Sequence, residues 1–293
     1  MSGKIRFAPS PTGYLHEGHL LSALYVWAAA KKWNLKIHLR IEDHDQSRAR
    51  PAYIEGIRED LAWLGFHYDS ESIQSARNEI YKAALQKLED KSLVYPCYCS
   101  RKQLLAENPQ SETGEIIYQG KCLSQLGSRK SELGIGAAPH NLRFIVPDKF
   151  IDWHDLRLGD FHENPKLQCG DFPIRDRDNQ WTYQFAVCVD DIDENITHIV
   201  RGEDIRNSTA RQIALMEALG RTERPIYLHH PLIVDENNKK LSKRELAHSL
   251  RQDKEAGITP EMLFGRVCFK ARLTESDTPI TLVNAMSIIM ERL

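Results

Sequence analysis

Apolar and polar positions follow two periods along the first part of the chain. A short apolar run over 5–8 is followed, from Gly18 on, by apolar residues at helical spacing, which predicts a strand and then a helix over about 19–33. Residues 36–42 alternate strictly between apolar and polar, which predicts a second strand. Strands that alternate with helices are typical of an α/β fold. The same patterns predict further helices over 51–64 and about 77–92.

The pattern changes in the middle of the chain. A polar, glycine-containing block holds several short β-type runs, and Asp178-Asn179 within it is typical of a hairpin turn between the runs 171–175 and 181–185. We expect this block to be inserted between two halves of a nucleotide-binding sheet. The predicted division is 1–94 for the first half of the core, 95–180 for the insertion, 181–245 for the second half and 246–293 for a short helical C-terminal segment.

Composition sets limits on the class of protein. The chain has 293 residues, a hydrophobic content of 41%, a charged content of 27% and a net charge of −2, which are ordinary values for a globular protein. Without a global basic field, a nucleic-acid partner would have to bind a local patch. The six cysteines accompany no secretory leader, so we expect reduced thiols or a metal site in a cytoplasmic protein. No apolar run approaches the roughly 20 residues that span a bilayer.

The stretch 6–19, RFAPSPTGYLHEGH, carries the first candidate chemistry. It predicts a strand, a tight turn and a helix N-terminus, an arrangement that presents backbone N–H groups to a phosphate. His16 and His19 stand at the helix start, and imidazoles donate hydrogen bonds to phosphate oxygens. Gly18 between them lets a ligand approach the backbone. The alternative is an ordinary strand-turn-helix with surface histidines.

This stretch resembles the HIGH signature of class I aminoacyl-tRNA synthetases, and its first half resembles the glutamyl/glutaminyl branch. The resemblance implies a Rossmann-type catalytic core, with His16, Gly18 and His19 binding ATP, Mg²⁺ accompanying the nucleotide, and the two histidines acting in catalysis. Glu17 departs from the signature, where an apolar residue is more frequent. A carboxylate aimed at phosphates would oppose binding, so we expect Glu17 to point away from them or to be paired.

A second set of residues concerns the amino acid. Glu42 follows a predicted strand, and ligands of open α/β sheets gather beyond the carboxyl ends of strands. The resemblance implies that Glu42 contacts the substrate's amino group. It also implies that glutamate is bound by Arg6, Ala8, Ser10, Tyr183 and Arg201. From composition alone, the acidic run over 190–194 is interpreted as a solvated turn, and Asp43 as part of an exposed one.

A lysine-rich stretch over 240–244, KLSKR, resembles the second signature of the class, KMSKS. The resemblance assigns Lys240, Ser242 and Lys243 to ATP binding and makes Lys243 catalytic. A mobile basic loop can close over a triphosphate and stabilise the charge that develops during transfer. By itself such a stretch is more often a solvated turn.

Three cysteines and one tyrosine form a candidate metal site. Cys97 and Cys99 lie in a short turn, and Cys122 is a distant third thiol, which fits a structural zinc site that lacks its fourth ligand. The alternative is a loop with free, partly buried thiols. A subgroup of the family carries a similar motif in which a tyrosine completes the set, and this implies Tyr118 as the fourth ligand.

The same subgroup implies the acceptor. After the second signature, residues 246–293 leave no room for the long helical anticodon-binding region of full glutamyl-tRNA synthetases. We therefore expect a monomer that activates L-glutamate with ATP and transfers it to queuosine in tRNA(Asp). The alternatives are a minimal glutamyl-tRNA synthetase that charges the 3′ end of tRNA(Glu), another adenylate-forming enzyme of the superfamily, and a non-catalytic regulatory paralogue.

Overall fold

The computed structural model describes residues 3–111, 114–125, 139–233 and 248–293. Its main feature is a seven-stranded sheet in the order β3-β2-β1-β9-β10-β6-β7. All its neighbours pair in parallel except β6 and β7. This confirms the predicted α/β class with a mostly parallel sheet. The strands are β1 (Lys4–Phe7), β2 (Lys36–Ile41), β3 (Ser70–Ile73), β6 (Ile151–Asp155), β7 (Gly159–Glu163), β9 (His198–Gly202) and β10 (Ile226–His230).

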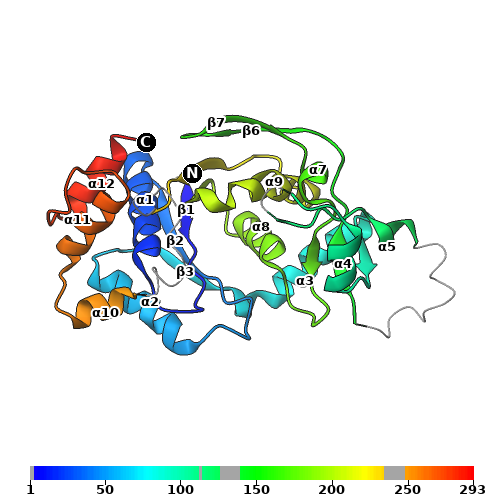
Figure 1. Ribbon diagram of the computed structural model, residues 1–293, viewed down its shortest axis with the longest axis horizontal. Coiled ribbons are helices and arrows are strands. Elements are labelled where there is room, and N and C mark those ends of the chain that lie inside the picture. The colour runs from blue at the N-terminus through cyan, green and yellow to red at the C-terminus, as the bar shows by residue number, and fades with distance from the viewer. Residues whose placement is uncertain (1–2, 112–113, 126–138, 234–247) are drawn as a thin grey trace.

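Helices cover both faces of this sheet, as Figure 1 shows. Along β9, Val200 packs in one apolar core and Ile199 in another, as expected when successive side chains point to opposite faces. The first core contains residues of α1 and of the C-terminal helices, and the second contains residues of α3, α8 and α9. The helices of this part of the protein are α1 (Glu17–Trp33), α2 (Pro51–Trp63), α3 (Asn78–Asp90), α8 (Tyr183–Asp193) and α9 (Thr209–Ala218). Two short 3₁₀ turns, η1 (Gln74–Arg77) and η2 (Glu203–Ser208), lie between them.

One sheet face carries a buried layer of charge between β1, β2 and α8. The guanidinium of Arg40, which is fully buried, donates to Asp191 at 2.6 Å and to Glu194 at 2.9 Å. Asp190 is also fully buried and accepts hydrogen bonds from Arg77 and Tyr81. The interpretation of 190–194 as a solvated turn is therefore wrong. The carboxylates of Asp190, Asp191 and Glu194, at the end of α8 and its C-cap, are buried and face the polar side of β2, whereas Asp193 is exposed.

Residues 95–180, predicted to be an insertion, contribute to two sheets. Three of their strands form a small antiparallel sheet, whereas β6 and β7 extend the edge of the large one. The turn around Asp178-Asn179 is present, with an isolated bridge between Arg175 and Trp181, but Tyr183 begins α8 instead of continuing a hairpin strand. The remaining elements of the block are β4 (Val94–Cys97), α4 (Arg101–Glu107), α5 (Lys121–Ser124), β5 (Asn141–Phe144), α7 (Pro165–Cys169) and β8 (Pro173–Arg175).

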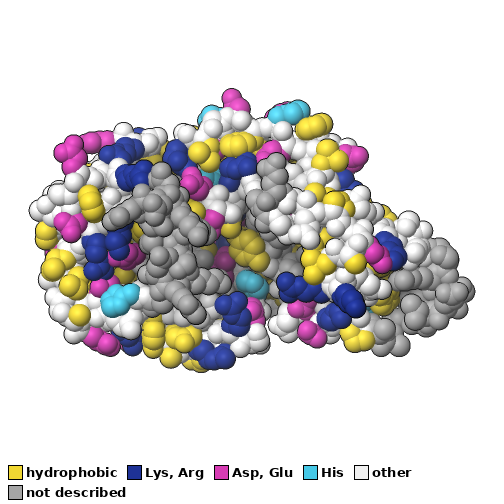
Figure 2. Space-filling view, viewed as in Figure 1, with side chains coloured by type: hydrophobic (Ala, Val, Ile, Leu, Met, Phe, Trp, Pro, Cys, Tyr) yellow, Lys and Arg dark blue, Asp and Glu magenta, His cyan; other side chains and the backbone are white. Residues whose placement is uncertain are grey.

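The C-terminal segment is helical, as predicted, and packs on α1. Its helices are α10 (Leu250–Glu255), α11 (Pro260–Lys270) and α12 (Leu282–Met290). None of the helices in the described ranges is long and apolar enough to cross a membrane. In Figure 2, Lys and Arg side chains are interspersed with Asp and Glu over the visible face, in keeping with the net charge of −2.

Candidate functional site

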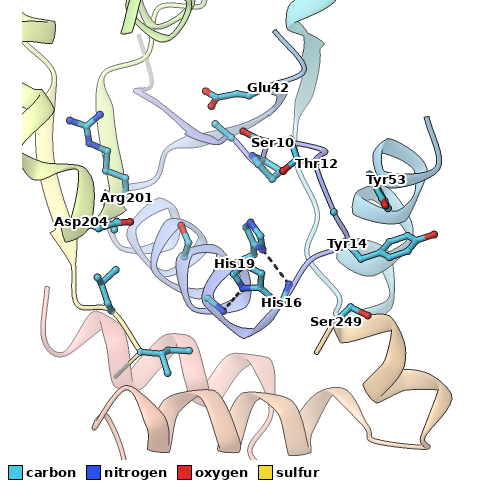
Figure 3. Close-up of a pocket in the computed structure, with 18 of the residues that line it drawn as sticks. Ser10, Thr12, Tyr14, His16, His19, Glu42, Tyr53, Arg201, Asp204 and Ser249 are labelled. Carbon is cyan, nitrogen blue, oxygen red and sulfur yellow. Dashed lines mark hydrogen bonds between the residues drawn. The ribbon is translucent and has the colours of Figure 1, made fainter. Parts of the chain in front are cut away.

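A pocket of about 1190 Å³ opens at the carboxyl ends of four parallel strands. Pro9 follows β1, Glu42 follows β2, and Arg201 and His230 stand at the ends of β9 and β10, and all four line the pocket. Ligands of open α/β sheets bind at this edge, where strand order reverses on either side of the first strand. The predicted location of the site is therefore where the structure places the pocket (Figure 3).

The two histidines of the first motif cap helix α1. The Nδ1 of His16 accepts a hydrogen bond from the backbone N–H of Gly18 at 3.1 Å, and the Nδ1 of His19 accepts one from the backbone N–H of His16 at 3.2 Å (Figure 3). A neutral imidazole that accepts at Nδ1 carries its proton on Nε2. The local fold thus fixes the tautomer in which each Nε2–H is a donor for an anion.

Both imidazoles are neutral at physiological pH. Burial lowers the pKa of His19 to about 3, and the neighbouring His16 acts in the same direction. Burial also lowers the pKa of His16, partly offset by Glu17. Before a ligand binds, each ring therefore offers a neutral N–H donor near the positive end of α1.

Glu17 is not among the residues that line the pocket. Its carboxylate lies 2.6 Å from Arg266 Nε and 2.6 Å from Lys270 Nζ, both on α11. The expectation that Glu17 points away or is paired is confirmed. The charge that departs from the signature is compensated by the C-terminal segment.

Glu42 is a buried carboxyl group that lines the pocket next to Arg40 of the buried layer of charge. Arg40 NH1 lies 3.8 Å from its Oε1. Burial raises the pKa of Glu42 to about 7, against the opposing effects of Arg40 and Arg6. A cationic amino group that entered the pocket would favour the ionised carboxylate. Asp43, the next residue, is buried and accepts a hydrogen bond from the backbone N–H of Ser75, so its predicted exposure is wrong.

Arg6, unlike the other residues predicted to bind the substrate glutamate, does not line the large pocket. Its Nε donates to Asp191 at 3.1 Å and its NH1 to the carbonyl of Val200 at 3.3 Å. Arg6 lines a small annex of about 100 Å³ that shares Glu42 and Arg201 with the large pocket. The other predicted residues that line the large pocket are Ala8, Ser10, His16, Gly18, His19 and Tyr183.

Arg201 near the end of β9 and Glu42 just after β2 both line the pocket, and Figure 3 shows both side chains above the two histidines of α1. Arg201 is buried and donates to Gln212 at 2.6 Å, to Thr209 at 2.9 Å and to His229 at 3.0 Å. The annex therefore contains the cationic guanidinium of Arg201 and the carboxyl group of Glu42, whose pKa is about 7.

Sequence reasoning missed residues on the far side of the pocket. Tyr14 and Tyr53 form an edge-to-face pair with centroids 4.9 Å apart, and the Arg251 guanidinium lies 4.6 Å from the Tyr14 ring. All three line the pocket. Their positions follow from the docking of the C-terminal segment, in which Leu250 N–H donates to the Leu15 carbonyl, and no motif marks this long-range contact. Lys240, Ser242 and Lys243 lie outside the described residues.

The candidate metal residues come together around one point. The sulfurs of Cys97, Cys99 and Cys122 lie within 4.8 Å of one another, and those of Cys99 and Cys122 are 3.5 Å apart. The Tyr118 hydroxyl oxygen lies 3.6 Å from the Cys97 sulfur and 3.7 Å from the Cys99 sulfur. Four-coordinate zinc with bonds of about 2.3 Å to sulfur and about 2 Å to oxygen would space these atoms by about 3.5–3.8 Å. The donor set therefore fits zinc.

The surroundings of this cluster also suit a thiolate site. The Arg143 guanidinium lies 3.9 Å from the centroid of the Tyr118 ring and supplies a nearby positive charge. The backbone N–H of Cys122 donates to the Tyr118 oxygen at 2.9 Å, which orients the hydroxyl group. The cluster, which lies at the end of β4 and on α5, could hold a metal.

Comparisons with known proteins agree with this geometry. Residues 4–281 match the family described as tRNA synthetases class I (E and Q), catalytic domain. A glutamyl-Q tRNA(Asp) synthetase of Symbiobacterium thermophilum is 38% identical over 288 residues, which cover 94% of this chain and 88% of that protein. A glutamate–tRNA ligase of Paraburkholderia phytofirmans is 40% identical over 276 residues, which cover 93% of this chain and 58% of the ligase.

A solved structure extends the comparison to the fold. The glutamate-tRNA synthetase of Elizabethkingia anophelis superposes with a TM-score of 0.75 at 26% identity, over 98% of this chain and 65% of that one. The chain thus spans somewhat under two thirds of that synthetase and of the Paraburkholderia ligase. Together with the first motif at the carboxyl end of β1, these matches show that the chain belongs to the class I tRNA synthetases (E and Q) and comprises their Rossmann-like α/β catalytic domain.

Proposed function

We propose that the protein activates L-glutamate with ATP to glutamyl-adenylate and transfers the glutamyl group to queuosine at the wobble position of tRNA(Asp). The observation that carries the first step is the joint arrangement of Glu42 and Arg201 in one annex, beside the capping histidines of α1. An amino acid with a second carboxylate matches these charges, since Glu42 can receive the ammonium group and Arg201 the side-chain carboxylate.

Activation needs positioning more than it needs a protein nucleophile. An oxygen of the α-carboxylate forms a bond to the α-phosphorus of ATP while the bond to the bridging oxygen breaks and pyrophosphate leaves. The Nε2–H groups of His16 and His19 would donate to phosphate oxygens on which negative charge develops. Mg²⁺ would enter with ATP and neutralise part of the triphosphate charge. Lys243 stays a prediction for the same charge.

In the second step a hydroxyl group of queuosine attacks the glutamyl carbonyl, an ester forms and AMP leaves. The likeness to the Symbiobacterium glutamyl-Q tRNA(Asp) synthetase, over 88% of that protein, supports this acceptor. The 40% identity with a glutamate–tRNA ligase supports a second candidate, transfer to the 3′ end of tRNA(Glu). Both candidates share the adenylate and differ only in the hydroxyl group that attacks it.

Zinc is proposed as a structural component held by Cys97, Cys99, Cys122 and Tyr118. When bound, the ion would cross-link the loop around Tyr118 to the strand that ends at Cys97. A location in the cytoplasm and a monomeric state belong to the same proposal.

Exchange of labelled pyrophosphate into ATP tests the first step. The purified protein is expected to catalyse this exchange in the presence of L-glutamate and far more slowly in the presence of L-glutamine or L-aspartate. The substitutions Glu42→Gln and Arg201→Leu should each lower the exchange rate by about 100-fold or more. Absence of exchange with every amino acid would overturn the enzymatic proposal.

Transfer of labelled glutamate tests the acceptor. Incubation with ATP and tRNA(Asp) that carries queuosine should place label on the anticodon fragment after nuclease cleavage, and tRNA(Asp) without queuosine should stay unlabelled. Label at the 3′ end of tRNA(Glu) would favour the second candidate. Equal labelling of tRNA(Asp) with and without queuosine would refute the first candidate, transfer to queuosine.

A further inference from the structure

Arg201 is a buried cation whose partners are neutral. Within the described ranges, its guanidinium has no carboxylate at ion-pair distance, and its three hydrogen-bond acceptors belong to Gln212, Thr209 and His229. A guanidinium has five N–H groups, so one N–H on each terminal nitrogen remains for a ligand. A buried positive charge without a counter-ion is costly, and an anionic ligand removes that cost.

The hydrogen bond from Arg201 determines the state of His229. Arginine can only donate, so the Nε2 of His229, 3.0 Å from Arg201 Nε, must accept. The proton of the neutral ring then lies on Nδ1, where Asp155 Oδ2 accepts it at 2.6 Å. Protonation of Nε2 would place a cation against the guanidinium. The function of Arg201 therefore depends on one tautomer of a buried imidazole.

Both carboxylate oxygens of Asp155 accept hydrogen bonds. Its Oδ2 also accepts the backbone N–H of His229 at 2.9 Å, and its Oδ1 accepts the backbone N–H groups of Arg157 and Leu158, each at 3.0 Å. Asp155 and His229 are both fully buried. Burial would raise the pKa of Asp155, but its hydrogen bonds outweigh that effect and hold the pKa below its usual value. Asp155 thus remains an ionised acceptor for the His229 proton.

This chain of hydrogen bonds joins two parts of the protein. Asp155 ends β6, which belongs to the inserted block, whereas His229 lies on β10 and Arg201 on β9 of the core. The two strands β6 and β10 meet at the bridge between Asp155 and Tyr227. The edge of the insertion is therefore in contact with the amino-acid annex through one imidazole.

We propose that His229, oriented by Asp155, is a positioning residue that holds Arg201 toward the side-chain carboxylate of the amino-acid substrate and so sets the preference for glutamate over glutamine. This inference rests on the proposed function of the annex. His229 does not itself touch the substrate. It keeps the guanidinium plane fixed and leaves Arg201, among the described residues that line the annex, as a cation without a carboxylate partner, which an uncharged amide neutralises less well than a carboxylate does.

Two near-isosteric substitutions separate this role from simple packing. In His229→Gln, the side-chain oxygen can occupy the position of Nε2 and accept from Arg201, while the donor to Asp155 is lost. In His229→Asn, the amide nitrogen can occupy the position of Nδ1 and donate to Asp155, but no acceptor reaches Arg201. His154→Gln is the matched control, because His154 lies on the same strand as Asp155 and is exposed.

Pyrophosphate exchange should be measured with varied glutamate, varied glutamine and varied ATP. His229→Asn is expected to raise KM for glutamate about 10- to 100-fold, the loss typical of a hydrogen bond to a charged group, with KM for ATP unchanged and a smaller glutamate-to-glutamine ratio of kcat/KM. His229→Gln should recover most of the KM and the ratio, and the control should match the wild type.

Equal effects of the Asn and Gln variants, or a raised KM for glutamate with an unchanged glutamate-to-glutamine ratio, would overturn the positioning role. Calorimetry of L-glutamate binding to each folded variant, checked by circular dichroism, gives the same comparison without catalysis. If the wild type neither exchanges nor binds glutamate, the proposed function fails. If the wild type binds glutamate and His229→Asn binds it equally well, only this inference fails.

Discussion

Arg266 Nε lies 2.6 Å from Glu17 Oε1 and thereby ties helix α11 to the first turn of α1, the turn that carries both pocket histidines. Lys270 Nζ lies 2.6 Å from the other oxygen of Glu17. Glu17 is only 12% exposed, so two cations on one helix compensate a largely buried carboxylate. The pair couples the orientation of the first motif to the docking of the C-terminal helices.

Removing both cations should therefore weaken the fold near the motif. Arg266→Ala/Lys270→Ala leaves Glu17 without compensation and also removes the cation that lies 2.7 Å from the buried Asp253 carboxylate. We expect the free energy of unfolding to fall by about 1–3 kcal/mol, between the values for exposed and buried pairs. Urea denaturation followed by circular dichroism measures this. We also expect KM for ATP to rise in the exchange assay, because the uncompensated carboxylate stands one residue from each pocket-lining neighbour, His16 and Gly18.

An apolar residue at position 17 provides the rescue. Glu17→Leu in the same background removes the uncompensated charge at position 17 and should restore part of the lost stability, while the pair between Arg266 and Asp253 stays broken. Lys82→Ala, which breaks the exposed pair with Glu79 on α3, is the control and should change stability by less than about 0.5 kcal/mol. A double variant as stable as the control would show that the ion pairs contribute nothing.

Glutamate binding should release protons near neutral pH. Burial raises the pKa of Glu42 to about 7, so the free site is partly protonated at pH 6.5, and the ammonium group of the ligand favours the ionised form. Affinity is expected to rise with pH up to about 7 and then to level off. Calorimetry at pH 6.5 in buffers of different ionisation enthalpy should detect the released proton, and little should be released at pH 8.5. Equal heats in all buffers at pH 6.5 would contradict this.

The same carboxyl group should make the empty protein less stable at high pH. Its folded pKa of about 7 lies above its ordinary value of 4.5, so between these values the native state binds more protons than the unfolded state. Stability from this group therefore falls as pH rises through the window and stays lower above it. Glu42→Gln removes the buried charge, and its melting temperature should exceed that of the wild type at pH 8 and match it more closely at pH 5.

The capping and catalytic roles of His16 can be separated. Asparagine is a good N-cap, so His16→Asn should keep the hydrogen bond from the Gly18 N–H and leave the free energy of unfolding within about 0.5 kcal/mol. It lacks the Nε2–H donor, and exchange should fall about 100-fold. His16→Ala should lose both the exchange activity and about 1 kcal/mol of stability. Full exchange activity in the Asn variant would exclude a phosphate contact.

Residues close in sequence were placed well from the sequence, whereas residues brought together by packing were not. The stretch 6–19 and Glu42 follow directly from strand periods and from the rule that ligands gather at strand ends. Asp191 could not be placed, because its burial on α8 depends on Arg6 and Arg40, which reach it from strands β1 and β2. An acidic run becomes buried only when such partners exist, and local composition does not reveal them.

Tyr183 and Asp155 illustrate the same limit. The β-branched and aromatic run around Tyr183 has strand propensity, but its apolar residues pack between α3 and α9 in a buried helix, so tertiary packing overrides local preference. Asp155 lies in a block predicted to be separate from the core, and its contact with His229 arises because β6 pairs with the edge of the large sheet. Neither placement is encoded within a short window of sequence.

The cysteine cluster should bind zinc in the purified protein. The protein purified without chelators should contain about one zinc per chain, since the donor atoms already lie at the spacing of a tetrahedral site. Cys122→Ala should lose the metal, and Cys188→Ala, which removes a buried thiol outside the cluster, should keep it. Metal content by plasma mass spectrometry distinguishes the two. Zinc retained in Cys122→Ala at the wild-type level would place the ion elsewhere.

Tyr118→Phe tests the fourth ligand within the same cluster. The ring and its contact with Arg143 remain, while the oxygen that lies 3.6 Å from the Cys97 sulfur is lost. If this oxygen binds zinc, the affinity measured by competition with a chelator should fall at least about tenfold, a loss as large as outer partners of a metal site cause. An unchanged affinity would mean that the three thiolates bind zinc with a water molecule instead. Because the cluster lies apart from the pocket, KM for glutamate should remain at its wild-type value either way.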